Sequence, residues 1–245
     1  MIKGLYEAAS GLLSEARAHE IRANNLANIN TVGFKKDTPF FRLLAASGSS
    51  SPHDPKNPSG VVVGGTATDF SQGPLKRTGN PLDLALDGDG FFVVKLGGKE
   101  GYTRAGNFKV GPGSKLLDQN GLPVLAEKGV LNIPAGAQVT IDSNGEVFAN
   151  GSSIGTLKVM TFDDKSVLKK VGNSLWVDGT GNTEPKKATG AKVQQGFLEM
   201  SNANVIEEMV SMIDEMRHFE AHQKAIRSIL DDTVGRTINS LPSLK

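Results

Sequence analysis

The sequence predicts an α+β protein, with long N- and C-terminal helices that pair as a coiled coil and a central antiparallel β domain. Apolar residues recur at alternating spacings of four and three over residues 5–26 and again over residues 205–230, which is a heptad pattern. Between these segments the period changes to two, and Asn-Gly and Asp-Gly pairs separate short apolar runs. The 245 residues are enough for one or two domains.

The first helix is expected to begin at Ile2 and to end near Asn30, because Gly33 follows it. Only His19 interrupts its apolar positions. These positions, the N-terminal seam, are Leu5, Ala9, Leu12, Ala16, Ala23 and Leu26. The alanines are small, so another helix backbone is able to approach closely. We assign the first domain segment to residues 1–44.

Residues 45–74 are interpreted as a flexible linker. Residues 45–60 contain five Ser, three Pro and two Gly, but no Val, Ile, Leu or Met. Such a composition buries too little apolar surface to offset the entropy of ordering.

The β domain is assigned to residues 75–197. Apolar residues alternate with polar ones in several short runs, and tight-turn pairs such as Asn144-Gly145 and Asn150-Gly151 lie between them. Asn-Gly and Asp-Gly tolerate the positive φ of type I′ turns, so each such pair predicts a hairpin. The runs are residues 82–86, 91–94, 139–141, 146–148, 157–162 and 175–177.

The last segment, residues 198–245, carries a helix of about 30 residues, a length of about 45 Å. Asn204 followed by Glu207 resembles a capping box, and Gly235 and Pro242 mark a possible end. Gln223 is the polar exception in its heptad positions. The C-terminal seam is Val205, Met209, Met212, Met216, Phe219, Ile226 and Leu230.

One apolar seam needs partners to cover it. The simplest arrangement is a helical hairpin within one chain, packed on the β domain. A second arrangement is a terminal coiled coil whose outer faces are covered by other subunits. Ile206, Val210, Ile213 and Ile229 widen the apolar surface and favour the second arrangement. We therefore expect both seams to be assembly interfaces in a self-assembling or co-assembling structural protein.

No motif predicts a catalytic, cofactor or metal site. The chain has no Cys, and Gly151–Gly155 fits the nucleophile-elbow pattern without the helix that must follow it. His218 and His222 lack a third ligand nearby in sequence. The formal charge of +1 argues against a nucleic-acid partner, and no phosphate-binding loop indicates a small-molecule substrate.

The N-terminus does not read as a targeting segment. Glu7, Glu15, Arg17 and Glu20 interrupt any signal-peptide core, and no run approaches the roughly 18 apolar residues of a membrane span. If the protein is exported, we expect export without a cleaved Sec-type leader.

The stretch Asn24-Asn25-Leu26-Ala27-Asn28-Ile29-Asn30-Thr31-Val32-Gly33-Phe34-Lys35 closely resembles the N-terminal signature of bacterial flagellar rod and hook proteins. Residues 79–92 and 102–108 resemble two further family motifs, and residues 195–213 resemble its C-terminal signature. The positions that match are Asn24, Asn25, Leu26, Ala27, Asn28, Thr31, Gly33, Phe34, Lys35, Gln195, Gly196, Ser201, Asn202 and Asn204.

The resemblance implies a non-enzymatic structural subunit of the basal-body rod, a hollow helical drive shaft that transmits torque. It implies terminal helices in the inner tube, the β domain outside, a periplasmic location and flagellar type III export. Its partners would be copies of itself, proximal and distal rod proteins, and the export apparatus. Length and the opening residues 1–6 resemble the proximal members of the F type, and the distal members of the G type are the alternative. Two alternatives belong to other functional classes: an enzyme, and a β-rich surface adhesion module.

Overall fold

The computed structural model describes the backbone of residues 2–44, 60–181 and 183–240, and the side chains of residues 4–42, 60–181 and 183–232. It has a helix near each end and antiparallel strands between them, so the predicted α+β class is confirmed. The chain divides into two compact units. The helical unit contains residues 1–27, 37–67 and 204–245, and the β unit contains residues 28–36 and 68–203.

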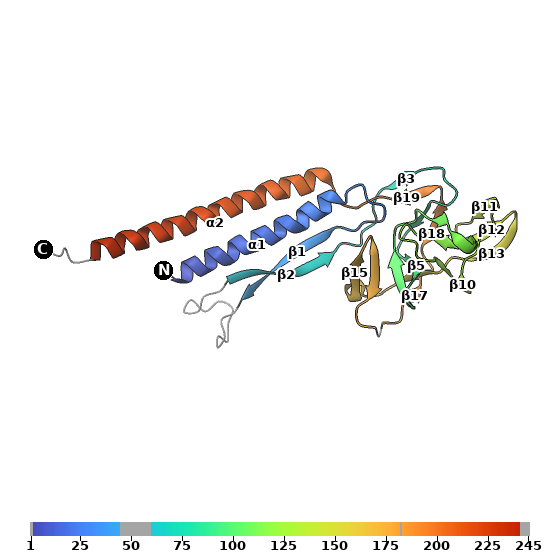
Figure 1. Cartoon of the computed structure of the whole chain (residues 1–245), viewed down its shortest axis with the longest axis horizontal. Helices are drawn as coiled ribbons and strands as arrows, with labels where there is room; N and C mark the ends of the chain where they lie inside the picture. Colours follow the sequence, from blue (N-terminus) through green and yellow to red (C-terminus); the bar gives the residue numbers. More distant parts are fainter. Residues whose placement is uncertain (1, 45–59, 182, 241–245) are drawn as a thin grey trace. The chain divides into compact units, whose positions relative to one another are not determined.

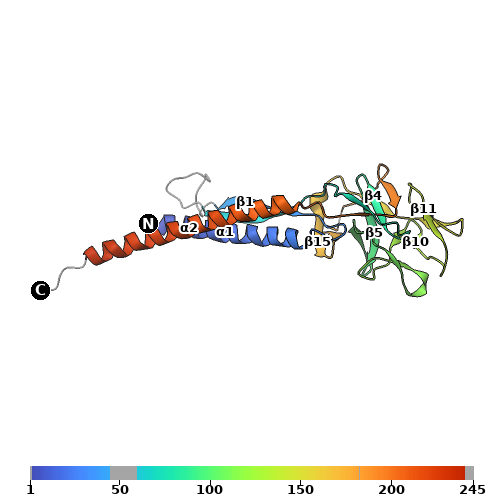
Figure 2. The ribbon, with the colours of Figure 1, turned by 90° about the horizontal axis from the view of Figure 1, so that it is seen from above.

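In the helical unit, α1 (Ile2–Ala27) and α2 (Val205–Ser240) lie side by side (Figures 1 and 2). Helix α1 ends at Ala27, three residues before the predicted end. The two terminal helices therefore contact each other within one chain, while coiled-coil geometry remains a prediction.

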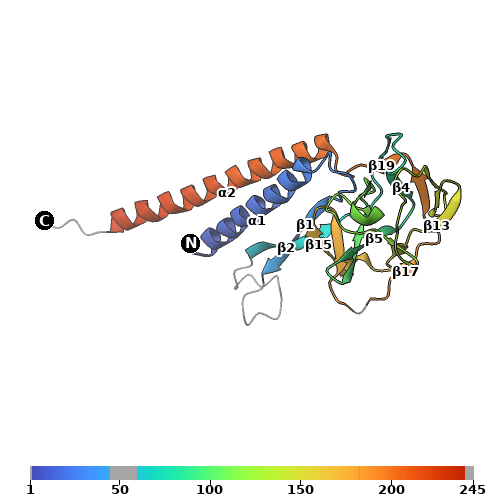
Figure 3. The same cartoon turned by 45° about the vertical axis from the view of Figure 1, so that its right-hand side comes forward.

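Helix α2 has 36 residues and is longer than expected. Asn204 caps its first turn, because its side-chain Oδ1 accepts the backbone N–H of Ile206 at 2.9 Å. Of the two residues predicted to mark a possible end, Gly235 does not end the helix, which continues through it to Ser240, and Pro242 lies outside the described residues. Figure 3 shows α2 continuing past the start of α1.

The predicted linker is wrong in its second half. Residues 60–68 form β2 (Gly60–Thr68), which pairs with β1 (Asp37–Leu44) in a two-stranded sheet beside α1. Three consecutive valines follow Gly60 in this segment, and they favour a strand. Residues 45–59, the rest of the Ser- and Pro-rich segment, lie outside the described residues.

The β unit is built on a six-stranded sheet with the order β15-β16-β6-β5-β14-β17. A three-stranded sheet, β11-β12-β13, and four strand pairs, β18-β4, β19-β3, β10-β9 and β7-β8, complete it. Every pair whose register is described in this unit is antiparallel. The strands are β3 (Leu75–Arg77), β4 (Leu84–Asp87), β5 (Phe91–Leu96), β6 (Lys99–Thr103), β7 (Lys109–Val110), β8 (Leu116–Leu117), β9 (Leu125–Ala126), β10 (Gly129–Val130), β11 (Val139–Ile141), β12 (Glu146–Ala149), β13 (Ser152–Thr156), β14 (Val159–Thr161), β15 (Leu168–Gly172), β16 (Leu175–Asp178), β17 (Lys186–Lys187), β18 (Lys192–Gln195) and β19 (Phe197–Glu199).

Two apolar clusters form the core of the β unit. The larger includes Leu84, Leu86, Phe92 and Val94, and the smaller surrounds the fully buried Trp176. Residues 91–94 contribute to both clusters, because successive side chains of a strand point to opposite faces. Trp176 therefore belongs to the core.

The Asn-Gly prediction holds at the hairpin between β12 and β13. Asn150 has φ +51° and Gly151 has φ +80°, as a type I′ turn requires. The Asp87–Gly90 segment does not make a hairpin, so this prediction was wrong. Strand β4 pairs with β18, whereas β5 pairs with β6 and β14, and the segment crosses between two sheets.

Among the described residues, no helix has the length and apolar character that a membrane span needs.

Candidate functional site

Three segments that are far apart in the sequence meet at Gly33 in the β unit. Gly33 has φ +66°, and a Cβ added there would lie 2.3 Å from the backbone nitrogen of Ala105. Its N–H donates to the carbonyl oxygen of Glu199 at 2.8 Å. Glycine is required here both for the left-handed backbone and for the close approach. The N-terminal signature, the segment at residues 102–108 and the C-terminal signature thus share one contact point.

A buried charged cluster lies at this junction and consists of Lys35, Arg104 and Glu199. Lys35 Nζ is 2.5 Å from Glu199 Oε1, and Arg104 Nη1 is 3.1 Å from Glu199 Oε2. The side chains of Lys35 and Glu199 are 0% exposed, and that of Arg104 is 2% exposed. One carboxylate therefore pairs with two cations, and each of its oxygens accepts a charge-assisted hydrogen bond.

Backbone groups make further hydrogen bonds to this cluster. Lys35 Nζ also donates to the Ser71 carbonyl at 2.6 Å, and the Gly73 N–H donates to Glu199 Oε1 at 3.0 Å. Burial lowers the pKa of the Lys35 ammonium, and the Arg104 guanidinium lowers it further, while the Glu199 carboxylate opposes both effects. The arrangement holds backbone segments together, and its ammonium has no open face toward a substrate.

The side-chain amides of two signature asparagines form hydrogen bonds with backbone N–H and carbonyl groups, as the backbone of a neighbouring strand would. Asn25 accepts the N–H of Asp37 at 3.0 Å and donates to the same residue's carbonyl at 2.8 Å. Asn202 accepts the N–H of Lys36 at 2.8 Å and donates to the Asp69 carbonyl at 2.8 Å. A side-chain amide offers both a donor and an acceptor, which explains why asparagine suits these positions.

Gln195 makes similar contacts at the edge of β11. Its Nε2 donates to the carbonyls of Val139 at 3.0 Å and Pro81 at 2.8 Å, and its Oε1 accepts the Ile141 N–H at 3.2 Å. The amide thus pairs with β11 as a neighbouring strand would. Gly196 follows with φ +80° and donates to the Asp83 carbonyl at 2.8 Å.

The other signature residues have local roles. Thr31 donates to the Asn28 side chain at 3.2 Å, and the buried Ser201 hydroxyl accepts the Ala203 N–H at 3.2 Å. The Phe34 ring is buried and lies 4.3 Å from Lys170 Nζ, a cation–π contact. Leu26 is half-buried, and Asn24 and Ala27 are exposed.

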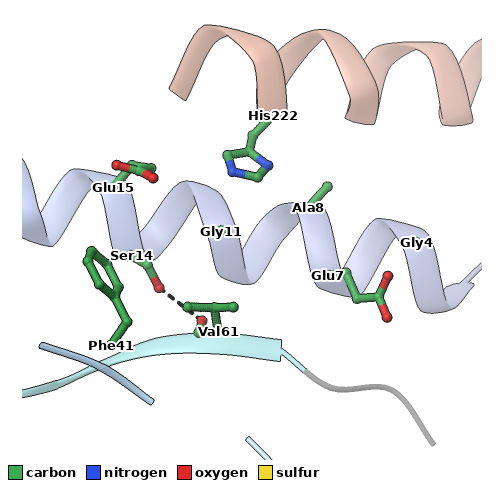
Figure 4. Close-up of a pocket in the computed structure, with 9 residues that line it drawn as sticks. All are labelled: Gly4, Glu7, Ala8, Gly11, Ser14, Glu15, Phe41, Val61 and His222. Atoms are coloured by element: carbon green, nitrogen blue, oxygen red, sulfur yellow. Dashed lines mark hydrogen bonds between the residues drawn. The ribbon is translucent and has the colours of Figure 1, made fainter. Parts of the chain in front are cut away.

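In the helical unit, α1 meets α2 and β2 through small residues. Among residues 4–18 of α1, the buried positions are Ala8, Gly11, Ser14 and Ala18. Figure 4 shows the His222 ring above Gly11. A Cβ at Gly11 would lie 2.6 Å from His222 Cε1. Closest packing therefore occurs where side chains are smallest.

Serines of α1 bind strand β2. The Ser14 hydroxyl donates to the Val61 carbonyl at 2.9 Å (Figure 4), and the Val61 N–H donates to the Ser10 hydroxyl at 3.2 Å. Both backbone groups of Val61 are thus satisfied by a helix, which fixes β2 against α1.

A second charged group joins α1 to α2. Arg22 lies 3.4 Å from Glu208 and 3.3 Å from Glu215, and Asn25 Nδ2 donates to Glu208 Oε2 at 3.3 Å. Glu208 is buried. Burial raises the pKa of Glu215, and Arg22 partly opposes that increase.

The structure brings parts of both predicted seams together. Ala16 and His19 of α1 and Met216 and Phe219 of α2 line a groove of about 340 Å³. Seam residues that are half-buried are Leu5, Leu12, Ala16, Leu26, Met212, Phe219 and Ile226. Those that are exposed are Ala9, Ala23, Val205, Met209, Met216 and Leu230. That these seams are assembly interfaces remains a prediction.

Three family models match the chain. Residues 5–35 match the model described as "Flagella basal body rod protein", and residues 85–149 match "Flagellar hook protein FlgE/F/G D1 domain". Residues 194–238 match "Flagellar basal body rod FlgEFG protein C-terminal". Among curated proteins, the flagellar basal-body rod protein FlgF of Caulobacter vibrioides is 34% identical over 95% of this chain and 94% of its own length.

The chain belongs to the flagellar basal-body rod and hook protein family. FlgG of Bacillus subtilis is 33% identical, over 92% of this chain and 94% of its own length. FlgF of Salmonella typhimurium is 31% identical over all of both chains. The N- and C-terminal family models together include Lys35 and Glu199, the two most closely joined residues of the buried cluster.

Sequence reasoning did not single out Arg104, Glu199 or Glu208 as site residues. All three lie inside recognised family segments, and for Glu199 a charge between Leu198 and Met200 was the available signal. The pattern at Gly151–Gly155 lies in the β12–β13 hairpin, so no nucleophile elbow forms there. His218 lies 3.5 Å from Glu15, and the described residues include no group of three or more suitable side chains that could hold a metal ion.

Proposed function

We propose that this protein is a non-enzymatic structural subunit of the flagellar basal-body rod and that it assembles through its terminal helices. The observation that carries the proposal is the apolar surface that remains exposed on α2, at Val205, Ile206, Met209, Val210, Ile213 and Met216. Six large apolar side chains on one helix face are expected to be covered by another molecule. Family membership supports the rod as the place where that occurs.

Within the family, we propose the proximal rod position of the F type. FlgF of Salmonella typhimurium matches this chain over the full length of both proteins, and the opening residues 1–6 support the same assignment. The distal G type is the alternative, because the FlgG relative is 33% identical, a value between those of the two FlgF relatives, 34% and 31%. The partners are copies of this chain, other rod proteins and the flagellar type III export apparatus, and the location is the periplasmic rod.

The decisive experiment is deletion of the gene from a motile strain, with electron microscopy of isolated basal bodies. We expect the deletion strain to be non-motile, with basal bodies that lack a complete rod. Normal rods would contradict the proposal. Complementation with residues 75–197 alone separates this function from a surface adhesion module, because only an adhesion module would retain activity without its helices.

A further inference from the structure

Three of the four histidines of the chain lie at the contact between α1 and α2. His19 of α1 lines the groove of about 340 Å³ together with Glu15 and Glu215. His218 Nδ1 of α2 is 3.5 Å from Glu15 Oε1. The His222 ring and Glu15 line a second cavity, on the side of α1 that faces α2 (Figure 4). Glu15 is therefore the carboxylate that the three histidines have in common.

Carboxylates outnumber the arginine side chain that pairs with them in this contact. The side chains of Glu15, Glu208 and Glu215 are 16%, 1% and 12% exposed. Arg22 pairs with Glu208 and Glu215, whereas the ionic partner of Glu15 among the described residues is His218. Three largely buried carboxylates therefore share one guanidinium, and only protonated histidines would balance the remaining negative charge.

Two buried polar atoms of this contact have no hydrogen-bond partner among the described residues. They are His19 Nδ1 and Glu215 Oε2, and both residues line the same groove. Burial raises the pKa of the Glu215 carboxyl, and the charges of Arg22 and His19 oppose that increase, so His19 acts on Glu215. A neutral imidazole has one N–H, whereas the protonated ring has two. One added proton therefore provides both a donor and a positive charge beside an unpaired carboxylate oxygen.

The other charged groups around these histidines are acidic as well. Glu20 lines the groove beside His19, and Glu7 lines the cavity beside His222. Strands β1 and β2 contribute apolar residues to that cavity. Apart from the histidines, the described charged residues that line the groove and the cavity are therefore all carboxylates.

We propose that the contact between α1 and α2 is a pH-sensitive element, which tightens when His19, His218 and His222 are protonated and loosens when they lose their protons. Histidine is the side chain that changes charge between about pH 5 and pH 8. Each proton reduces the excess of negative charge in the contact, so protonation favours the folded helix pair. By linkage, the stability of the pair decreases as pH rises through this range.

The three histidines are expected to contribute unequally. His19 contributes most, because its Nδ1 is buried beside a carboxylate. His218 contributes least, since its side chain is 66% exposed and exposed ion pairs are weak. This property belongs to the single chain and goes beyond the proposed function, because it does not depend on what the chain assembles with.

Thermal unfolding of the purified full-length chain, proven to be monomeric, tests the proposal at about pH 6 and about pH 8. Far-ultraviolet circular dichroism follows the helices, and Trp176 fluorescence follows the β unit, which contains no histidine. We expect the helical transition to be at least about 4 °C higher at the lower pH. The Trp176 transition should not rise on acidification.

Replacement of the histidines identifies the groups responsible. His19→Gln retains a polar side chain that does not titrate, and we expect it to remove at least about half of the difference between the two pH values. The triple variant that adds His218→Gln and His222→Gln should remove all of it. The matched control is His53→Gln, at the fourth histidine, which lies outside the described residues and should leave the difference intact.

A second variant is informative if His19→Gln prevents helix formation at both pH values. Glu15→Gln keeps every histidine and removes the carboxylate that they have in common, so the pH difference should decrease. An unchanged difference in Glu15→Gln or in the triple variant overturns the proposal. A native chain with equal transitions at both pH values, or with no helical transition at the lower pH, also overturns it, as does loss of the difference in His53→Gln. The rod assignment is tested separately by the deletion strain.

Discussion

At the scale of single residues, the family signatures mark positions where segments distant in the sequence touch. Gly33 has no room for a side chain beside Ala105, and the Glu199 carboxylate pairs with both Lys35 and Arg104 without access to solvent. Buried charged residues are unusual in a strand-rich interior, yet each of these has a specific partner. Their role is to fix the junction of three chain segments.

Removal of the central carboxylate is expected to destabilise the β unit strongly. Glu199→Gln removes the buried carboxylate that pairs with both cations and leaves Arg104 with the exposed Asp89 carboxylate at 3.7 Å, so we expect a loss of about 3–5 kcal/mol in the free energy of unfolding. Urea unfolding followed by the fluorescence of Trp176, the single tryptophan, measures this loss. The exposed Glu184→Gln is the control, expected within about 0.5 kcal/mol of the native protein. Equal stabilities of the two variants would contradict the structural role of the cluster.

Tyr102 is expected to ionise late. Burial, together with the nearby Glu100 carboxylate, raises the pKa of Tyr102 to about 12. The chain has two tyrosines, so an ultraviolet absorbance titration should show one phenolate forming only near pH 12. Tyr102→Phe should remove this step, and Tyr6→Phe should retain it.

The same shift predicts the direction of the pH dependence of stability. Between about pH 10 and pH 12 the folded chain keeps the Tyr102 proton and the unfolded chain loses it. The free energy of unfolding should therefore decrease as pH rises through this window. A decrease of the same size in Tyr102→Phe would show that another group is responsible.

At the scale of elements, the terminal helices pack through absent or very small side chains. The buried face of α1 carries Ala8, Gly11, Ser14 and Ala18, and β2 is held by serine hydroxyls. Such a face permits close approach but buries little apolar area per residue. The larger apolar side chains lie at the margins of the contact or on the outside, available to other molecules.

Gly11 provides a test of this packing. Alanine at Gly11 would clash with the His222 ring, whereas alanine at Gly4 would make an ordinary contact 3.5 Å from Ile229. Both changes increase helix propensity by about 1 kcal/mol. We therefore expect Gly4→Ala to stabilise the helical unit, and Gly11→Ala to be less stable than Gly4→Ala in thermal unfolding followed by circular dichroism. Adding His222→Ala should restore stability in Gly11→Ala, and failure of this rescue would exclude the contact as the cause.

At the scale of the whole molecule, the apolar surface is distributed unequally between the two units. The β unit contains both apolar core clusters, whereas the helical unit has most of the exposed large apolar residues. A subunit with this distribution gains stability when it assembles, because the remaining apolar surface is removed from water only then.

Hydrogen exchange on the purified monomer tests this expectation. Amides of residues 205–230 should exchange quickly in the monomer and become protected on assembly, while β5 and β6 should be protected in both states. Strong protection of residues 205–230 in a proven monomer would contradict a dependence of α2 on its neighbours.

The sequence by itself determined the fold class, the two terminal helices, the Asn204 cap and the family, because periodicity and contiguous motifs are local properties of a chain. It also indicated more apolar surface on α2 than one partner helix covers. Only the tertiary structure decided that β2 begins at Gly60, where pairing with β1 adds to the strand propensity of the valines, and that α2 continues through Gly235. The partnership of Lys35, Arg104 and Glu199 likewise depended on folding, because 164 residues separate the lysine from the carboxylate and no local pattern joins them.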